Sequence, residues 1–272
     1  MMSRIFKVAA LVVLVVALTP SAALADTVTV TGTGTAGNGV PLAASVTFTT
    51  LAGGQLMVTL TNTASSDVQA PQNILTGIFF TISGVTLTPV SATLGSGSTV
   101  IFPAANCVAT PAQCSGTDMG GEWGYASSLS GAPGGAAQGI SSSGLGFFAS
   151  GNFNGPNLWA PTNGAVDGLQ GGILSTGDNT STGNAPVTGG QALVQDTVVF
   201  ILGGLPTNFT LSGNVTNVSF QYGTGLCEPN IGPNGSNPNP PACTPVPEPG
   251  TLALFGTGLL SLAGVIRRRI AG

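Results

Sequence analysis

The sequence predicts an all-β protein: a single antiparallel β-sandwich or jelly-roll-like domain with long Gly/Ser-rich loops, plus an N-terminal signal helix and a C-terminal transmembrane helix. Short segments alternate apolar residues with threonine at period two, as half-buried strands do. Turn residues separate these segments, with 42 glycines and 19 prolines in 272 residues. An unbroken apolar stretch stands near each end. A domain of this length buries roughly 70% of the surface of its unfolded chain, enough for a core of its own.

The expected strands fall into two groups, separated by a long irregular middle. Residues 45–50 (SVTFTT) and 55–61 (QLMVTLT) alternate most clearly, and the intervening Ala52-Gly53-Gly54 predicts a hairpin turn. Residues 103–190 are rich in Gly, Ser, Ala, Asn and Pro, which predicts long loops with a few short strands packed over the sandwich. The full set of expected strands is 26–31, 45–50, 55–61, 75–83, 85–90, 192–202, 209–211 and 215–222.

The charges are placed so that several function classes are excluded. The basic residues are Arg4, Lys7 and three arginines near the C-terminus, and no Lys, Arg or His stands between Asp26 and Ile266. Without basic side chains the body cannot neutralise phosphates, so we expect no nucleic-acid partner. Without histidine it can hold neither a Ser-His-Asp triad nor a His-ligated zinc. The sequence therefore predicts a protein that is not an enzyme, with no cofactor and no metal.

Residues 1–25 are typical of a secretory signal peptide. Arg4 and Lys7 supply its positive start, and residues 8–18 form an uninterrupted apolar run. Ala23 and Ala25 give the small-x-small pattern that precedes a cleavage site. The expected partners at this end are the Sec translocon and signal peptidase. An uncleaved anchor is the alternative, but the apolar run is short for a membrane span.

Residues 251–266 form the second apolar stretch and predict a transmembrane helix. At about 1.5 Å per residue this helix spans roughly 24 Å, which is short but workable for a bilayer. Arg267, Arg268 and Arg269 follow at once. A basic cluster stays on the cytoplasmic side, so these arginines act as a stop-transfer signal and leave the body outside the cytoplasm. A buried helix of a soluble protein is the alternative, and it would rarely end in three arginines.

Pro247, Glu248 and Pro249 stand directly before this helix. Together with the helix and the arginine cluster, they make residues 246–272 resemble the PEP-CTERM sorting signal. The resemblance implies recognition of Pro-Glu-Pro by an exosortase, a membrane-embedded enzyme that removes the anchor. It also implies delivery of the body to the cell surface or extracellular matrix of a Gram-negative producer of exopolysaccharide. It covers about a tenth of the chain and implies nothing about the fold of the body.

Four cysteines form two local pairs in a chain expected to be exported. Oxidising compartments favour disulfides, so we expect the bridges Cys107–Cys114 and Cys227–Cys243. A tetrathiolate metal site is less consistent with these spacings. The second bridge would close a loop in residues 227–245, a Pro/Asn/Gly-rich stretch that predicts an unpacked stalk after a body at 26–226.

Three groups of residues in the body could carry chemistry. Asp118 and Glu122 could be the acid and nucleophile of a glycosidase, although the Gly-Gly between them argues for a loop. Trp123 and Trp159 could stack on sugars. Residues 176–184 and 152–155 resemble calcium loops, but the first has Gly189 where an EF-hand has its last carboxylate.

The sequence thus predicts an exported surface or extracellular-matrix protein with a structural or interaction role linked to exopolysaccharide or biofilm. The alternatives are a carbohydrate-binding module that uses loop aromatics and, less favoured, a glycan hydrolase.

Overall fold

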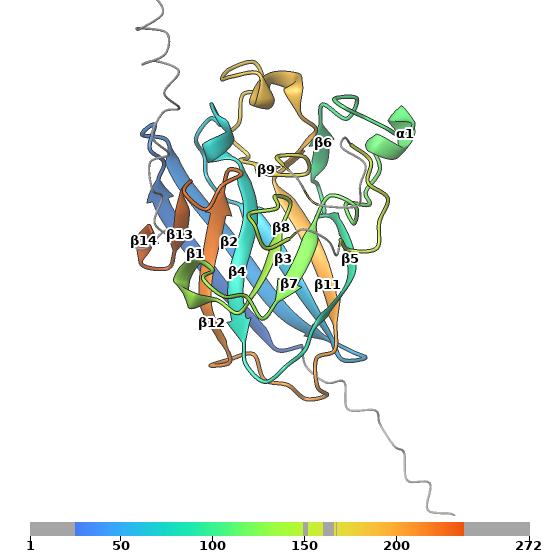
Figure 1. Ribbon diagram of the computed structural model, residues 1–272, viewed down its shortest axis with the longest axis vertical. Helices are drawn as coiled ribbons and strands as arrows, with labels where there is room; N and C mark the ends of the chain where they lie inside the picture. Colours follow the sequence, from blue (N-terminus) through green and yellow to red (C-terminus); the bar gives the residue numbers. More distant parts are fainter. Residues whose placement is uncertain (1–24, 149–151, 160–165, 167, 237–272) are drawn as a thin grey trace, which may run out of the picture.

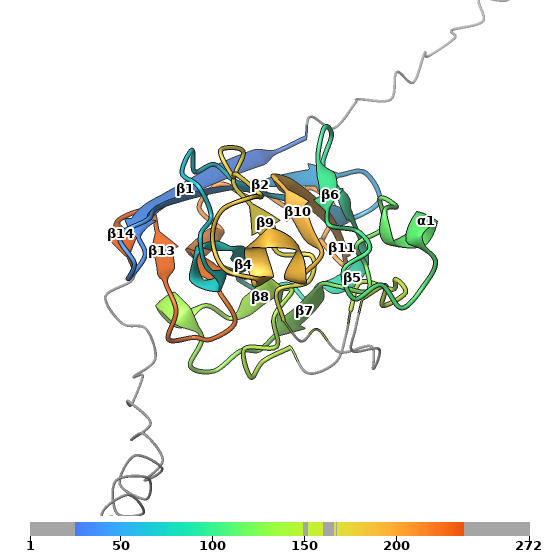
Figure 2. The same cartoon turned by 90° about the horizontal axis from the view of Figure 1, so that it is seen from above.

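The computed structural model describes residues 25–148, 152–159, 166 and 168–236. Two β-sheets pack face to face, as Figure 1 shows from the side and Figure 2 from above. The first sheet has the order β1-β2-β3-β11-β5, and all of its neighbours are antiparallel. Its strands are β1 (Thr27–Thr35), β2 (Pro41–Leu51), β3 (Gln55–Asn62), β11 (Thr197–Gly203) and β5 (Thr88–Leu94).

The second sheet has the order β14-β13-β12-β4-β9-β10-β6, with β8 joining β4 to β7. Its one parallel pair among the described strands is β9 with β10. The strands are β4 (Leu75–Ile82), β6 (Thr99–Ile101), β7 (Gly124–Ser127), β8 (Gln138–Ser141), β9 (Ile173–Leu174), β10 (Leu193–Gln195), β12 (Val215–Tyr222), β13 (Asn230–Gly232) and β14 (Gly235–Ser236). Short helical turns are η1 (Pro71–Asn73), α1 (Pro111–Cys114), η2 (Pro133–Gly135) and η3 (Pro186–Gly190).

The alternation of the sequence places one face of the first sheet in the core. In β2 and β3 every second side chain is buried, including Phe48 and Val58, while threonines face outward. Phe48 meets Phe80 of the second sheet edge to face, with ring centroids 5.2 Å apart. This inter-sheet layer is the main core, and burying each large side chain in it contributes about 2–3 kcal/mol.

Strand β4 is buried on both faces, unlike the strands of the first sheet. Phe80 points into the main core, whereas Phe79 packs against Phe148 on the opposite face. The loops on either side of β8, including η2 and the turn that carries Phe148, thus cover the outer face of β4 (Figure 2). This explains why β4 carries the consecutive apolar residues Ile78, Phe79 and Phe80 rather than a strict alternation.

Most expected strands are confirmed, although β1 and β2 are longer than expected and three other segments differ more. The strand expected at 85–90 begins later, at Thr88. The segment expected at 192–202 is divided into β10 and β11, because Asp196 adopts a φ of 113° that no continuous strand allows. Residues 209–211 form no strand. Instead, Phe209 N–H bonds to the Pro206 carbonyl in a turn.

The stalk expected at 227–245 is wrong for its first part, because the sheet continues into it. Strand β13 pairs with β12, and β14 pairs with β13. The polar side chains are satisfied inside the sheet: Asn230 Nδ2 donates to Gln221 Oε1 at 3.2 Å, and Gln221 Nε2 donates to the Gly225 carbonyl at 3.0 Å. The described sandwich therefore extends to Ser236.

The signal helix expected at 1–25 and the transmembrane helix expected at 251–266 lie almost wholly outside the described residues. Within the described part of the chain, no helix is both long enough and apolar enough to cross a membrane.

Candidate functional site

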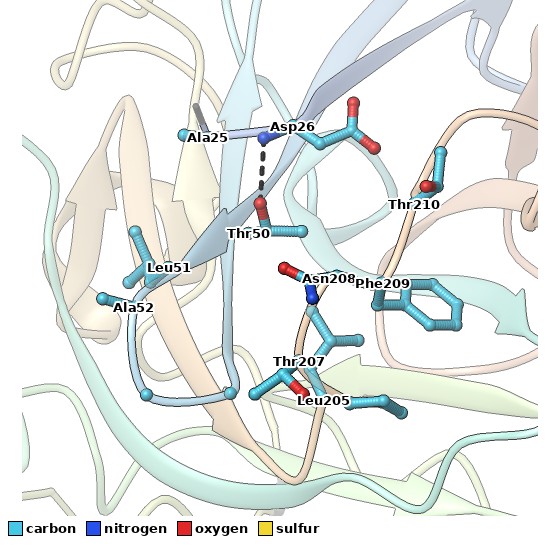
Figure 3. A pocket seen from close by; sticks show the side chains of 13 residues that line it. Ala25, Asp26, Thr50, Leu51, Ala52, Leu205, Thr207, Asn208, Phe209 and Thr210 are labelled. Atoms are coloured by element: carbon cyan, nitrogen blue, oxygen red, sulfur yellow. Dashed lines mark hydrogen bonds between the residues drawn. The ribbon is translucent and has the colours of Figure 1, made fainter. Parts of the chain in front are cut away.

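A pocket of about 570 Å³ opens at one end of the sandwich, where three segments meet (Figure 3). The start of β1 supplies Ala25 and Asp26, the β2–β3 turn supplies residues 50–54, and the segment after β11 supplies residues 205–210. Ala25 belongs to the cleavage motif expected from the sequence, whereas Ala23 lies outside the described residues. The pocket therefore lies where the processed chain is expected to begin.

Backbone and side-chain bonds fix the walls of this pocket. Asp26 N–H donates to Thr50 Oγ1 at 2.9 Å, and Thr50 N–H donates to the Asp26 carbonyl at 2.9 Å. Leu205 N–H donates to the Gly54 carbonyl at 2.8 Å. A side chain at position 54 would collide with the Leu205 carbonyl oxygen, so the close approach of the two segments requires glycine.

The groups that line the pocket suit a neutral, hydroxyl-rich ligand. Thr50, Thr207 and Thr210 offer hydroxyls, and Asn208 offers an amide that turns toward Thr50 in Figure 3. Leu51 and Leu205 supply apolar surface beside them. The Asp26 carboxylate is the charged side chain of the lining, and it accepts a hydrogen bond from Leu211 N–H. No pattern in the sequence indicates this site, because its polar residues come from turns far apart in the chain.

The two tryptophans that the sequence offered as a possible sugar-stacking pair are in the core, so this alternative is wrong. Trp123 is 0% exposed and Trp159 is 1% exposed. Trp123 packs against Phe200 with ring centroids 5.0 Å apart, and Trp159 Nε1 donates to the Pro103 carbonyl at 3.1 Å. Stacking needs a ring face open to solvent, which neither side chain has.

Asp118 and Glu122, the carboxylates weighed as a glycosidase pair, hold backbone groups. Glu122 is 4% exposed, and its Oε1 accepts hydrogen bonds from the N–H groups of Leu158 (2.7 Å) and Trp159 (3.3 Å). Asp118 Oδ1 accepts one from Gly120 N–H at 2.9 Å. Glu122 thereby fixes the returning segment that carries Trp159.

A second acidic pair, Asp67 and Asp178, joins two loops at the end of the sandwich opposite the pocket. Asp67 accepts hydrogen bonds from Asn179 N–H (2.9 Å) and Thr182 Oγ1 (2.6 Å), and Asp178 Oδ1 accepts one from Val68 N–H (3.0 Å). Burial raises the pKa of Asp178 to about 6, and the charge of Asp67 adds to this shift. The Thr182 hydrogen bond holds the pKa of Asp67 below its usual value.

Asp178 of this pair lies in residues 176–184, the segment that resembles a calcium loop. Among the described residues, no three His, Cys, Asp or Glu side chains gather where they could hold a metal ion. The two carboxylates act here as acceptors that join the segment after β3 to the segment after β9.

The disulfide Cys107–Cys114 is confirmed, with its Cα atoms 6.1 Å apart. It closes the loop that holds α1 beside Trp159, which forms a β-bridge with Cys107. Cys227 is also disulfide-bonded, and Cys243 lies outside the described residues, so the bridge Cys227–Cys243 stays a prediction.

The sorting residues Pro247, Glu248 and Pro249 and the arginines 267–269 lie outside the described residues as well. Comparison of the chain with curated proteins and with solved structures found no match. Comparison with protein families found one: residues 245–269 match the PEP-CTERM protein-sorting motif. This motif indicates an exported, transiently membrane-anchored surface protein that is targeted to an exosortase. The chain therefore carries a PEP-CTERM protein-sorting motif immediately after a β-sandwich body.

Proposed function

We propose that this protein is a structural component of the cell surface or extracellular matrix of a Gram-negative bacterium, with a role linked to exopolysaccharide or biofilm. The carrying observation is the sorting motif at residues 245–269, which follows a sandwich that is described as far as Ser236. Removal of the anchor by an exosortase releases this body as one folded unit. Signal peptidase and the Sec translocon act before that step.

The chemistry of the body supports a role without catalysis. Glu122 is buried against backbone N–H groups, so it is not presented to a substrate. The outer face of the first sheet is lined by threonines, which bond to one another across strands, as in Thr29 with Thr47 (3.0 Å) and Thr61 with Thr197 (2.9 Å). A neutral, hydroxyl-covered sheet is suited to contact with a hydrated polysaccharide.

A second proposed function, sugar binding, is favoured by the pocket beside Asp26. Its hydroxyls, its Asn208 amide and its lack of basic side chains fit a neutral glycan. In this proposal the sugar is bound by the turn at 205–210 and not by Trp123 and Trp159. Asn208→Ala should abolish retention on the producer's own polysaccharide. Asn106→Ala, an exposed position outside the pocket lining with a similar positive φ, should leave it intact. Equal retention of both variants would exclude the pocket.

Mass spectrometry of the protein recovered from culture medium and from the cell envelope tests the main proposal. We expect a chain that begins at Asp26, has lost residues 251–272 and is enriched with the polysaccharide matrix. A protein found only as the full chain in the membrane, or one that is absent from the matrix, would contradict the proposal.

A further inference from the structure

The sandwich has one long sheet edge with which no other described strand pairs. Strand β1, with nine residues, stands at one border of the first sheet and pairs only with β2. An open edge of this kind presents a row of free backbone donors and acceptors that can pair with another strand. Figure 2 shows β1 along the rim of the sheet, with β13 and β14 near one end on the side of the second sheet.

The other edges are short or covered. At the far border of the first sheet, the segment at 117–119 lies along β5: Leu94 N–H donates to the Thr117 carbonyl, and Met119 N–H donates to the Ala92 carbonyl, both at 2.9 Å. In the second sheet, β14 has two residues, β6 three and β7 four. Proteins shorten or cover their edges in these ways to prevent association. The long and uncharged β1 edge, with which no further described strand pairs, is therefore an exception.

The hydrogen bonds show which groups of β1 are free. Thr50 N–H bonds to the Asp26 carbonyl, and Ala36 N–H bonds to the Val40 carbonyl, which fixes the even-numbered residues as those that bond to β2. Because hydrogen-bonded and non-bonded positions alternate in an antiparallel pair, the odd-numbered residues direct their N–H and C=O groups to the open edge. These residues are Thr27, Thr29, Thr31, Thr33 and Thr35, and all five are exposed.

We propose that the β1 edge binds the β1 edge of a second copy of this chain, antiparallel, with Thr31 opposite Thr31 on a two-fold axis. The strand is self-complementary in this register. The threonines face threonines on the outer side, and Val28 and Val30 face Gly34 and Gly32 on the inner side. All nine residues are paired, and the two first sheets join into one continuous sheet.

Charge and size define what kind of contact this is. No charged residue stands in β1, so two copies of the strand can meet without electrostatic repulsion. The paired edge is about 30 Å long, and such a contact buries less than the ~1,600 Å² of a standard interface. The association is therefore weak and concentration-dependent. A second copy of the chain is then the partner in the proposed structural role. The inference rests on that role, because a matrix would concentrate the protein enough for a weak contact to form.

Cross-linking of a single cysteine variant tests the register. In Thr31→Cys the two introduced thiols face each other across the axis, at a Cα separation of about 5.5 Å that a disulfide can bridge. In the control Thr27→Cys the two cysteines lie at opposite ends of the paired strands. We expect a reducible dimer for Thr31→Cys and none for Thr27→Cys. Each variant is purified from cells that express the full chain, from whichever fraction contains it. The test therefore still works if the protein is not sorted as proposed.

Analytical ultracentrifugation over a range of concentrations tests the association itself. The wild type should show a dimer that grows with concentration, and Thr31→Lys should lose it because two ammonium groups then meet on the axis. Thr59→Lys adds the same charge to the outer face of β3, away from the edge, and should dimerise like the wild type. A wild type that stays monomeric at every concentration, or equal cross-linking of the two cysteine variants, would overturn the proposal.

Discussion

Asp26 and Thr50 bind each other twice, through Asp26 N–H to Thr50 Oγ1 and through Thr50 N–H to the Asp26 carbonyl, both at 2.9 Å. Cleavage after Ala25 would turn the Asp26 nitrogen into the N-terminal amine. That amine would be the only basic group between positions 26 and 266. The contact with Thr50 would then hold the new chain end against the β2–β3 hairpin and shape the pocket.

Thr50→Val should lower the free energy of unfolding of the processed protein by about 1 kcal/mol, because the hydroxyl that accepts the hydrogen bond from the Asp26 nitrogen is lost. Denaturant unfolding measures this. The control is Thr59→Val, at a half-buried position on the outer face of β3, which should stay within about 0.5 kcal/mol of the wild type. Equal losses in the two variants would show that the Asp26 contact contributes nothing.

Glu122→Gln should destabilise the fold by about 1–2 kcal/mol, since a buried carboxylate that accepts two backbone N–H groups is replaced by a neutral amide. Asp118→Asn, which affects one partly buried bond, should cost less. Thermal unfolding compares the two variants. Unchanged stability in Glu122→Gln, together with loss of a glycan-cleaving activity, would instead support the hydrolase alternative.

Gly121→Ala should prevent normal folding or cost more than about 3 kcal/mol, because a Cβ at this position would overlap the Pro156 carbonyl. The backbone at 120–121 passes directly against that at 155–156, and this approach places Glu122 beneath Leu158. Gly37→Ala is the matched control, since a Cβ there meets open space. Expression yield and circular dichroism distinguish the variants. A folded, stable Gly121→Ala protein would refute this packing.

Asp178 should make stability fall as the pH rises from about 4 to about 6. Its pKa is raised to about 6 in the folded state, so the native protein holds a proton there that the unfolded chain has already released. With solvent screening of this half-exposed group, the loss is about 1 kcal/mol. Asp178→Asn should remove this slope.

Asp67 acts with the opposite sign and in a different pH range. Because the pKa of Asp67 is lowered in the folded state, its carboxylate stabilises the fold at every pH above the usual pKa of an Asp side chain. That stabilisation is lost as the pH falls below about 4. Unfolding measured from pH 3 to pH 8 separates the two groups. A wild type and Asp178→Asn with parallel stability curves from pH 4 to pH 6 would contradict the assignment.

The local alternation of apolar residues and threonine was enough to predict β1, β2 and β3, because each has one face toward the core. It could not predict that Trp123 and Trp159 are core residues. Their segment has no regular period, and their burial depends on long-range closure by Glu122 and the Cys107–Cys114 bridge. Polar composition also misassigned Asn230, because the pairing with β12 and the Gln221 amide outweigh it.

The pocket was even harder to predict, because it is formed by contacts between segments far apart in the sequence. Asp26 and Leu211 are 185 positions apart, yet the Leu211 N–H donates to the Asp26 carboxylate. No local pattern indicates such a contact. In contrast, the sorting motif is read from a short linear segment, so its recognition required no knowledge of the fold.

Replacement of Pro247, Glu248 and Pro249 by alanine tests the central claim most directly. The measurement is the mass and distribution of the protein between membrane and medium, with the wild type compared in the same cells. If an exosortase recognises this motif, the variant is exported but stays in the membrane fraction with residues 251–272 still attached. A variant that reaches the medium at the size and rate of the wild type would contradict the account.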